Sequence, residues 1–538
     1  MFSKISETSS SSPTPHLAFL LTSFFLYFLY KKFTSYLRWK QSPLWKLPGT
    51  KQKDCWWLTG NFFAISKSPF MTLQQKWFKE ANDVNIPFLH SCMLFGNHTV
   101  AVLDADIVKM ILYESYTKDN SRFVKQMKVL MNILGMGLIT YEGEEWQRHR
   151  RIVHPSFQPK LVKEALESTA PGVVKKFVDC WKKAGGNREI DVMTHFSSAT
   201  LDIIGKAAFS HNFHALDSIE KWADAKDSKD ESNSAEVPKM SDRLIVSFGN
   251  LFKFTPLRII LALNDLSWLD RGRNKARAVM KEAVSNILDA ARAKNKHNDE
   301  SSGEALSLLQ VLLKANDTDA KVHARNRLND EELQNEIKTF LLAGHETTAT
   351  LCYWVMYILC TEHPEIQEKV SADIMKHSSH LQVDEFNIEV VEKMEYFDAF
   401  IKEVLRFYPP AGLVIHHTTQ DENMKGCIIP KKTRIMIPIY LLHRHPKYWK
   451  DPNTFKPERW MEDSHPASHP CAYLPFSLGG RNCIGSQFAL WEAKLLLAPI
   501  LREFSIRIAS SMRNTEFTLT QAITLKTKPR LRICVEKR

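Results

Sequence analysis

The chain has 538 residues, with 72 lysines and arginines against 60 aspartates and glutamates, and therefore a formal net charge of +12. Hydrophobic residues make up 44% of it and charged residues 25%, which is typical of globular proteins and excludes collagen-like, coiled-coil and wholly disordered chains. Its nine cysteines are an odd number without paired spacing, which argues against a disulfide framework and favours a reducing compartment. Nucleic acid, acidic lipid headgroups and an acidic protein could each account for the basic excess.

The amino-terminal region joins an uncharged apolar run to a cluster of cations. Leu17–Tyr30 holds 14 residues without a charge. At about 1.5 Å per residue, a helix of that length covers roughly 21 Å, which is shorter than a bilayer core of about 30 Å. Seven cations follow the run with no acid among them: Lys31, Lys32, Arg38, Lys40, Lys46, Lys51 and Lys53.

This region could be a signal peptide that is cleaved off or a membrane anchor that is retained. A cleaved signal peptide would use the run as its apolar core, but here the cations follow the run, and no small-x-small cleavage site precedes Lys31. We therefore expect residues 1–47 to be a retained, single-pass membrane anchor with a basic linker. The positive-inside rule then places residues 48–538 in the cytosol. The cation cluster explains most of the net charge without nucleic acid.

The rest of the chain predicts one large domain, residues 48–538, that is mainly α with a minor β-sheet portion. Most stretches have helical periodicity. Two polar segments, about 225–240 and 293–303, are typical of surface loops. Short β-like runs lie near residues 97–103, 433–438 and 529–535.

The first segment with candidate binding residues is Trp146-Gln-Arg-His-Arg150. Trp146 offers an indole N–H and Arg150 a fork of donors, and both suit a carboxylate. The basic run Arg148–Arg151 could bind nucleic acid or an acidic protein.

A long helix is predicted next, with Asn329 and Asp330 as its amino cap and its end near Cys360. Its middle contains Ala343-Gly-His-Glu-Thr-Thr348 in an otherwise apolar stretch. The polar residues could face the surface, with threonine bonding to the preceding turn. Alternatively, Glu346 and Thr347 are an acid–alcohol pair that relays protons, and Gly344 permits a local kink.

Downstream, Glu403-Val-Leu-Arg406 puts an acid and a base on one helix face. Arg459, within Pro457–Trp460, could complete a buried triad with them. Four histidines nearby suggest zinc, but no Cys-x-x-Cys completes such a site, so solvated loop residues are expected at His443, His445, His465 and His469.

The most informative segment is Phe476-Ser-Leu-Gly-Gly-Arg-Asn-Cys-Ile-Gly485, which precedes an amphipathic helix over residues 487–497. Glycines allow a tight turn and a close approach to a flat cofactor. A cysteine at a helix amino end receives N–H groups that stabilise a thiolate, and a thiolate is an axial ligand of haem iron. For Cys483 alone, a buried structural thiol is the alternative.

This segment resembles the haem-binding loop of the cytochrome P450 family, Phe-x-x-Gly-x-Arg-x-Cys-x-Gly, at every fixed position. Trp146–Arg150, Ala343–Thr348, Glu403–Arg406 and Pro457–Trp460 resemble further family elements and occur in the family's order. The resemblance implies the cytochrome P450 fold and noncovalent haem b. It also implies a role for each matching residue: Cys483 as the iron ligand, Arg481, Trp146, Arg150, Phe476 and Gly485 in cofactor binding, Glu346 and Thr347 in catalysis, and Glu403, Arg406 and Arg459 as structural residues.

The resemblance further implies a monooxygenase of the endoplasmic reticulum membrane that inserts one oxygen atom from O₂ into a hydrophobic substrate such as a fatty acid, sterol or terpenoid. NADPH–cytochrome P450 reductase would supply electrons, with a b-type cytochrome as an auxiliary donor and Arg148–Arg151 as a docking surface. The alternative is a reductase-independent isomerase or dehydratase acting on lipid hydroperoxides, against which the intact Glu346–Thr347 pair argues. A third class is a noncatalytic haem- or sterol-binding scaffold.

One position departs from the family pattern. Many relatives have a propionate-binding arginine shortly after the Glu-x-x-Arg element, whereas this chain has His416 and His417 there. His416 either replaces that arginine, which would make propionate binding more sensitive to pH, or lines a loop with its neighbour.

Overall fold

The computed structural model describes residues 70–81, 85–93, 97–113, 128–186, 188–224, 240–251, 269–295, 307–317, 327–462, 465–521 and 523–538, with single positions between 23 and 47. Most of the predicted anchor run Leu17–Tyr30, and all seven cations after it, lie outside these residues. Within the described part of the chain, no helix combines the length and apolar character needed to cross a membrane.

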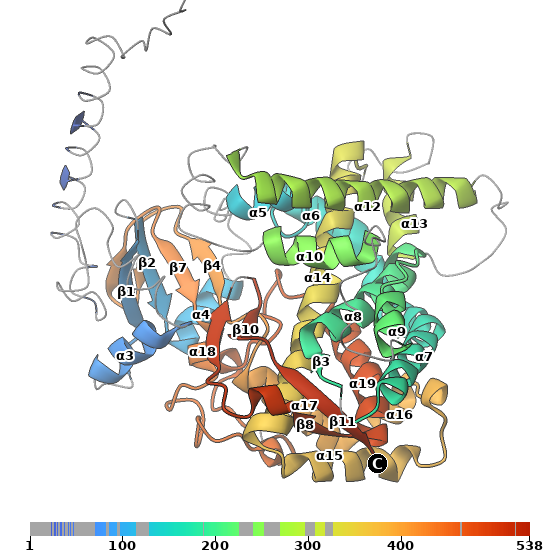
Figure 1. Cartoon of the computed structure of the whole chain (residues 1–538). Helices are drawn as coiled ribbons and strands as arrows, with labels where there is room; N and C mark the ends of the chain where they lie inside the picture. The colour runs from blue at the N-terminus through green and yellow to red at the C-terminus, as the bar shows by residue number, and fades with distance from the viewer. Residues whose placement is uncertain are drawn as a thin grey trace, which may run out of the picture.

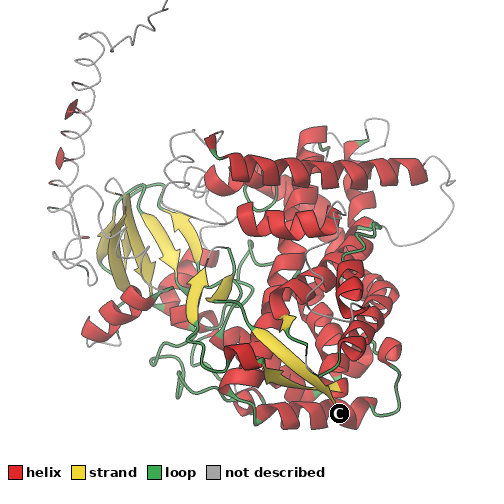
Figure 2. Ribbon diagram, in the orientation of Figure 1, coloured by secondary structure: helices red, strands yellow, loops and turns green. Residues whose placement is uncertain are grey.

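Helices form most of the described fold; the four-stranded sheet lies at one side, and the shorter strands lie among the helices (Figures 1 and 2). This agrees with the predicted mainly α class. The α-helices are α3 Thr72–Ala81, α4 Ala105–Tyr113, α5 Lys128–Leu134, α6 Gly143–Val153, α7 Pro159–Ala184, α8 Val192–Phe209, α9 Leu216–Asp224, α10 Met240–Leu251, α12 Arg271–Asn295, α13 Leu308–Asn316, α14 Asp330–Tyr357, α15 Ile366–Ser378, α16 Ile388–Glu392, α17 Glu395–Phe407, α18 Ile439–Leu442 and α19 Ser486–Glu503.

The strands form small sheets. The main sheet has the order β1-β2-β7-β4, and β2 and β7 pair in parallel although more than 300 residues separate them. The β-like runs near 97–103, 433–438 and 529–535 correspond to β2, β7 and β11. The strands are β1 Phe88–Met93, β2 Asn97–Val102, β3 Ile190–Asp191, β4 Val414–His417, β5 Glu422–Met424, β6 Cys427–Ile429, β7 Arg434–Ile437, β8 Phe504–Ile508, β9 Thr518–Gln521, β10 Leu525–Lys528 and β11 Arg532–Lys537.

Helix α14 runs through the middle of the helical body (Figure 1). A capping box starts it, in which the Asn329 side chain accepts from the Glu332 N–H and the Glu332 carboxylate accepts from the Asn329 N–H, both at 2.9 Å. The helix continues without interruption through Gly344, and the local kink stays a prediction. A Cβ atom at Gly344 would lie 2.7 Å from the end of the Ile204 side chain on α8, so a larger residue would require that side chain to move.

A buried carboxylate joins α17 to the segment that follows α18. Glu403 accepts hydrogen bonds from Arg406 Nη2 at 2.7 Å and from Arg459 Nε at 3.1 Å. Trp460 Nε1 donates to its other oxygen at 2.9 Å. The Glu403 and Arg406 side chains have no exposed surface, so the carboxylate depends on these donors in place of water.

His443 extends this network toward the cysteine-containing segment. Its Nδ1–H donates to the Arg406 carbonyl at 3.1 Å, and its Nε2 accepts from the Leu474 N–H at 2.7 Å. Burial lowers the pKa of His443 to about 3, so the ring is neutral. His443 and His445 are both buried, so the expectation of solvated residues is wrong for these two.

We predict that Glu403→Gln destabilises the protein by about 3–5 kcal/mol, because removing one partner leaves buried guanidinium groups unpaired. The measurement is urea unfolding of the full chain. Glu395→Gln, on an exposed position of the same helix, is the matched control. Equal unfolding midpoints for the two variants would contradict the role given to Glu403.

Candidate active site

The segment from Phe476 to Gly485 forms a compact loop before α19. The Cys483 N–H donates to the Phe476 carbonyl at 2.9 Å, which closes the loop. Gly479 has a positive φ of 75°, and a Cβ atom there would lie 2.3 Å from the Leu112 carbonyl oxygen, so the turn and the close approach both require glycine. Gly485, the N-cap of α19, has φ −92°, and its Cβ would make only an ordinary contact with Phe157.

Cys483 differs from the other cysteines whose side chains are described. The seven cysteines with described side chains, Cys483 included, are all free, and Cys483 is the exposed one among them. Nevertheless, burial among protein atoms raises the pKa of its thiol, although the Gly485 N–H and the charge of Arg150 act in the opposite direction. The Gly485 N–H and Arg150 are the contacts that favour a thiolate here. The thiolate at the helix amino end stays a prediction.

Three further predicted residues gather beside this loop. Arg150 on α6 donates to the Asn482 carbonyl at 3.1 Å and to its side-chain oxygen at 3.0 Å. The Arg481 guanidinium lies 4.5 Å from the centre of the buried Trp146 ring and donates to the Tyr141 carbonyl at 2.8 Å. Helix α6 thus places Arg150 and Trp146 against the loop that carries Arg481 and Cys483.

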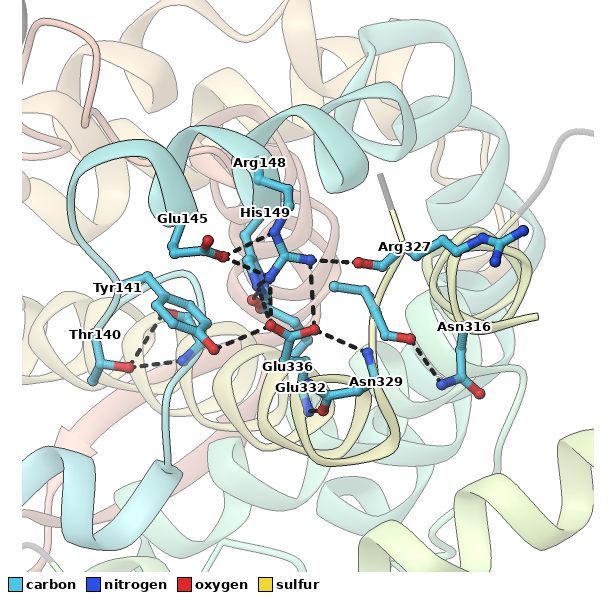
Figure 3. A network of polar contacts seen from close by, with 12 residues as sticks. Thr140, Tyr141, Glu145, Arg148, His149, Asn316, Arg327, Asn329, Glu332 and Glu336 are labelled. Atoms are coloured by element: carbon cyan, nitrogen blue, oxygen red, sulfur yellow. Dashed lines mark hydrogen bonds and ion pairs between the residues drawn. The ribbon is translucent and has the colours of Figure 1, made fainter. Parts of the chain in front are cut away.

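The opposite face of α6 is fastened to α14 by polar contacts (Figure 3). Arg148 Nη2 donates to Glu145 at 2.7 Å and also to Glu332, and it lies 3.1 Å from His149 Nε2. His149 Nδ1 lies 2.5 Å from a Glu336 oxygen, and neither side chain has exposed surface. We refer to Glu145, Arg148, His149, Glu332 and Glu336 as the α6–α14 clamp.

The clamp changes the interpretation of two sequence features. Glu145, His149 and Glu332 have ligand atoms close enough together for a metal ion, but the Arg148 guanidinium lies among them and supplies the positive charge. Arg148 was expected on a docking surface with Arg151. Its side chain is only 19% exposed, so that expectation is wrong for Arg148, whereas Arg151 is exposed.

On α14, Glu346 and Thr347 have different partners. The Thr347 hydroxyl donates to the Ala343 carbonyl at 2.7 Å. The Glu346 carboxylate accepts from Lys526 Nζ at 2.5 Å and from the Thr524 hydroxyl at 2.9 Å. Consecutive helical residues point about 100° apart, which explains why the acid and the alcohol face different elements.

Lys526 and Thr524 were missed by the sequence reasoning. Lys526 lies on β10, and Thr524 is the residue before this strand begins. Almost 180 residues separate both from Glu346. An alternating lysine–threonine strand carries no signal of such a contact. His416, on β4, pairs in register with Ile435 of β7 and is half-buried; its role toward a propionate stays a prediction.

The comparisons with known proteins agree with this geometry. The family model described as Cytochrome P450 matches residues 50–535. This chain belongs to the cytochrome P450 family. Cytochrome P450 4V2 of Mus musculus is 30% identical over 446 residues, covering 79% of this chain and 78% of the relative. Cytochrome P450 4A2 of Rattus norvegicus is 30% identical over 502 residues, covering 91% of this chain and 90% of the relative.

A solved structure shows the same fold. The crystal structure of cytochrome P450DA heme domain matches with a TM-score of 0.68 and 22% identity, covering 91% of this chain and 96% of that chain. The family membership and these relatives make the chain a cytochrome P450 monooxygenase with a haem-thiolate cofactor.

The residues of this cytochrome P450 fit such a cofactor. Cys483 offers a soft sulfur ligand on the accessible side of its loop. Arg150 and Arg481 place guanidinium groups beside it, which suit the carboxylates of a porphyrin. Coordination to a metal ion removes the proton from a cysteine ligand, so the raised pKa of Cys483 is compatible with a thiolate ligand in the holoprotein.

We predict that Arg148→Met lowers the free energy of unfolding by about 1–3 kcal/mol near neutral pH, since Glu332 loses a charged donor. Burial by itself would raise the pKa of Glu332, but its bond to Arg148 and the N-cap hold it below the ordinary 4.5. Because the pKa of Glu332 is lower in the folded protein than in the unfolded chain, ionised Glu332 stabilises the fold at pH values above its ordinary pKa. This stabilisation is lost as the pH falls through the lowered pKa of the folded state.

The difference in the free energy of unfolding between wild type and Arg148→Met should therefore become smaller at acidic pH. Urea unfolding at pH 7 and near pH 4 tests this, with the exposed Arg151→Met as the control. A loss of stability that is the same at both pH values would show that Arg148 acts by packing alone.

Proposed function

We propose that the chain is a membrane-anchored monooxygenase that inserts one atom of O₂ into a hydrophobic substrate, with a fatty acid, sterol or terpenoid as the substrate class. The observation that carries this proposal is the accessible thiol of Cys483 beside the guanidinium groups of Arg150 and Arg481. The overall reaction consumes two electrons and two protons, and the second oxygen atom leaves as water.

Haem b would be held by this chain's residues as follows. Cys483 would ligate the iron, and Arg481, Arg150 and Trp146 would donate to the propionates. Thiolate-ligated haem supplies O–O cleavage and oxygen insertion. The α6–α14 clamp holds α6 against α14 through Glu332 and Glu336. Trp146 and Arg150, on another face of α6, thereby stay beside the cysteine loop.

Proton supply is assigned to the middle of α14. The Glu346 carboxyl is the group that can take up and release a proton, and the Thr347 hydroxyl can pass one on, since its own hydrogen bond to Ala343 leaves its oxygen able to accept. Glu346 is held by Lys526 of β10, and Thr347 is held by the Ala343 carbonyl within α14.

Apolar side chains in the segments predicted to line the pocket support the apolar substrate class. Phe248 on α10 is buried, and its ring lies 4.5 Å from the ring of His345, which precedes Glu346. Leu413 and Val414, after α17, are half-buried. Such side chains suit a lipophilic molecule.

Electrons and location complete the proposal. No flavin or nicotinamide motif is visible in the sequence, so NADPH–cytochrome P450 reductase is the proposed donor, with a b-type cytochrome as an auxiliary donor. Residues 1–47 are the proposed anchor in the endoplasmic reticulum membrane, and residues 48–538 are the proposed cytosolic haem domain. The exposed Arg151 remains available to an acidic donor.

We predict that Cys483→Ser abolishes the red-shifted CO band of the reduced, haem-loaded protein. A serine oxygen cannot replace thiolate as the strongly electron-donating ligand. Cys427→Ser, which changes a half-buried thiol on β6, should retain the band. A red-shifted band that survives in Cys483→Ser would contradict the proposed ligand.

The same preparation distinguishes the two candidate activities. Full chain reconstituted with reductase and NADPH in phospholipid vesicles should form oxygenated product from a panel of fatty acids, sterols and terpenoids. Turnover of a lipid hydroperoxide without NADPH, together with no NADPH-dependent product from the panel, would instead favour the isomerase or dehydratase.

A further inference from the structure

Lys526 contacts Glu346, and the role inferred for Lys526 rests on the proposed function of Glu346 in proton supply. Lys526 Nζ lies 2.5 Å from Glu346 Oε1, and the side chains are 23% and 13% exposed. The Thr524 hydroxyl donates to the same oxygen at 2.9 Å. Two donors from one short segment therefore converge on a single carboxylate oxygen of α14.

The position of Lys526 is fixed by contacts on both sides of it. Trp354 Nε1 donates to the Leu525 carbonyl at 2.8 Å. The Tyr353 hydroxyl is hydrogen-bonded to the Thr527 hydroxyl and accepts from the Leu531 N–H at 3.1 Å. Tyr353 and Trp354 lie two turns after Glu346, on the same side of α14. Strand β10 is thereby attached along α14 in one register, which places Lys526 at Glu346.

The charge balance at Glu346 depends on this placement. Burial would raise the pKa of Glu346, but the charge of Lys526, followed by that of His345 and the hydrogen bonds from Lys526 and Thr524, lowers it below the ordinary value. His345, on α14 itself, packs against Phe248 of α10. On α19, the buried acid Glu492 faces Thr348, two residues after Glu346, and its charge also acts on Cys352. Burial raises the pKa of Glu492 well above its ordinary value.

We propose that Lys526 is a positioning residue that holds Glu346 ionised and directed toward β10, and so sets the pH range in which Glu346 can supply protons. The ammonium group is partly exposed, whereas the carboxylate is nearly enclosed. Lys526 is therefore the more exposed partner of this ion pair. The role requires a cation at this position and not only a side chain of its length.

The test uses the full chain with three substitutions at this contact and one control. Lys526→Met keeps the length but removes the charge, Lys526→Arg keeps the charge, and Thr524→Val removes one donor. Lys528→Met removes a cation from an exposed position on the same strand. Circular dichroism establishes that each variant is folded.

The first readout is infrared spectroscopy of the protein without substrate. We expect Lys526→Met near neutral pH to show a new carbonyl stretch of a protonated carboxyl group, because the lysine charge no longer opposes the effect of burial on Glu346. The band should vanish when Glu346→Gln is added. Wild type, Lys526→Arg and Lys528→Met should lack it, and Thr524→Val should show a smaller change in the same direction.

The second readout is the pH profile of product formed per NADPH consumed. We expect the titration in this profile to move upward by about one pH unit or more in Lys526→Met, a tenfold change in the ratio of ionised to protonated Glu346. Lys526→Arg should restore it. The proposal would be overturned if Lys526→Met had the same pH profile as wild type and showed no new carboxyl band.

The two proposals fail in different ways. If the full chain binds no haem with a red-shifted CO band, the proposed function fails, while the infrared comparison still decides whether Lys526 controls Glu346. If the band is present and Lys526→Met matches wild type in both readouts, only the role of Lys526 fails.

Discussion

The buried Glu403 carboxylate imposes the constraint on which the active-site geometry depends. A carboxylate without exposed surface must be neutralised and hydrogen-bonded. Arg406, Arg459 and Trp460 meet this need. Because these donors come from separate segments, the fold forms only when α17 and the chain after α18 lie together. His443 then links Arg406 to Leu474, two residues before Phe476, so the position of the cysteine loop depends on the same network.

Pairs of opposite charge also fix the other elements of the site. Arg148 joins α6 to α14 through Glu332, and Lys526 joins β10 to α14 through Glu346. In both pairs the side chains are largely enclosed, where a charge without its partner would be costly. Helix α14 is thus the common reference, because α6 and β10 are each joined to it by an ion pair.

Sequence reasoning located what is local. The cap at Asn329, the helix after Gly485, the β-like runs near 97–103 and 433–438 and the turn at Gly479 each follow from a few neighbouring residues. It was wrong where a side chain's surroundings come from distant segments. Arg148 and His443 were assigned to solvated surfaces because polar residues usually lie there, and both are enclosed by other elements.

The sequence by itself determined the mainly helical class, the resemblance to the cytochrome P450 family and the residues that could serve a haem, because motif chemistry is written in residues close together along the chain. The tertiary structure alone decided which charges meet Glu346 and Glu332. Lys526 reaches Glu346 across 180 residues, and Arg148 reaches Glu332 across 184. Such pairings depend on how helices and strands pack, and no spacing within one segment encodes them. The physical reason is that burial makes an unpaired charge costly, so the packed fold selects its partner.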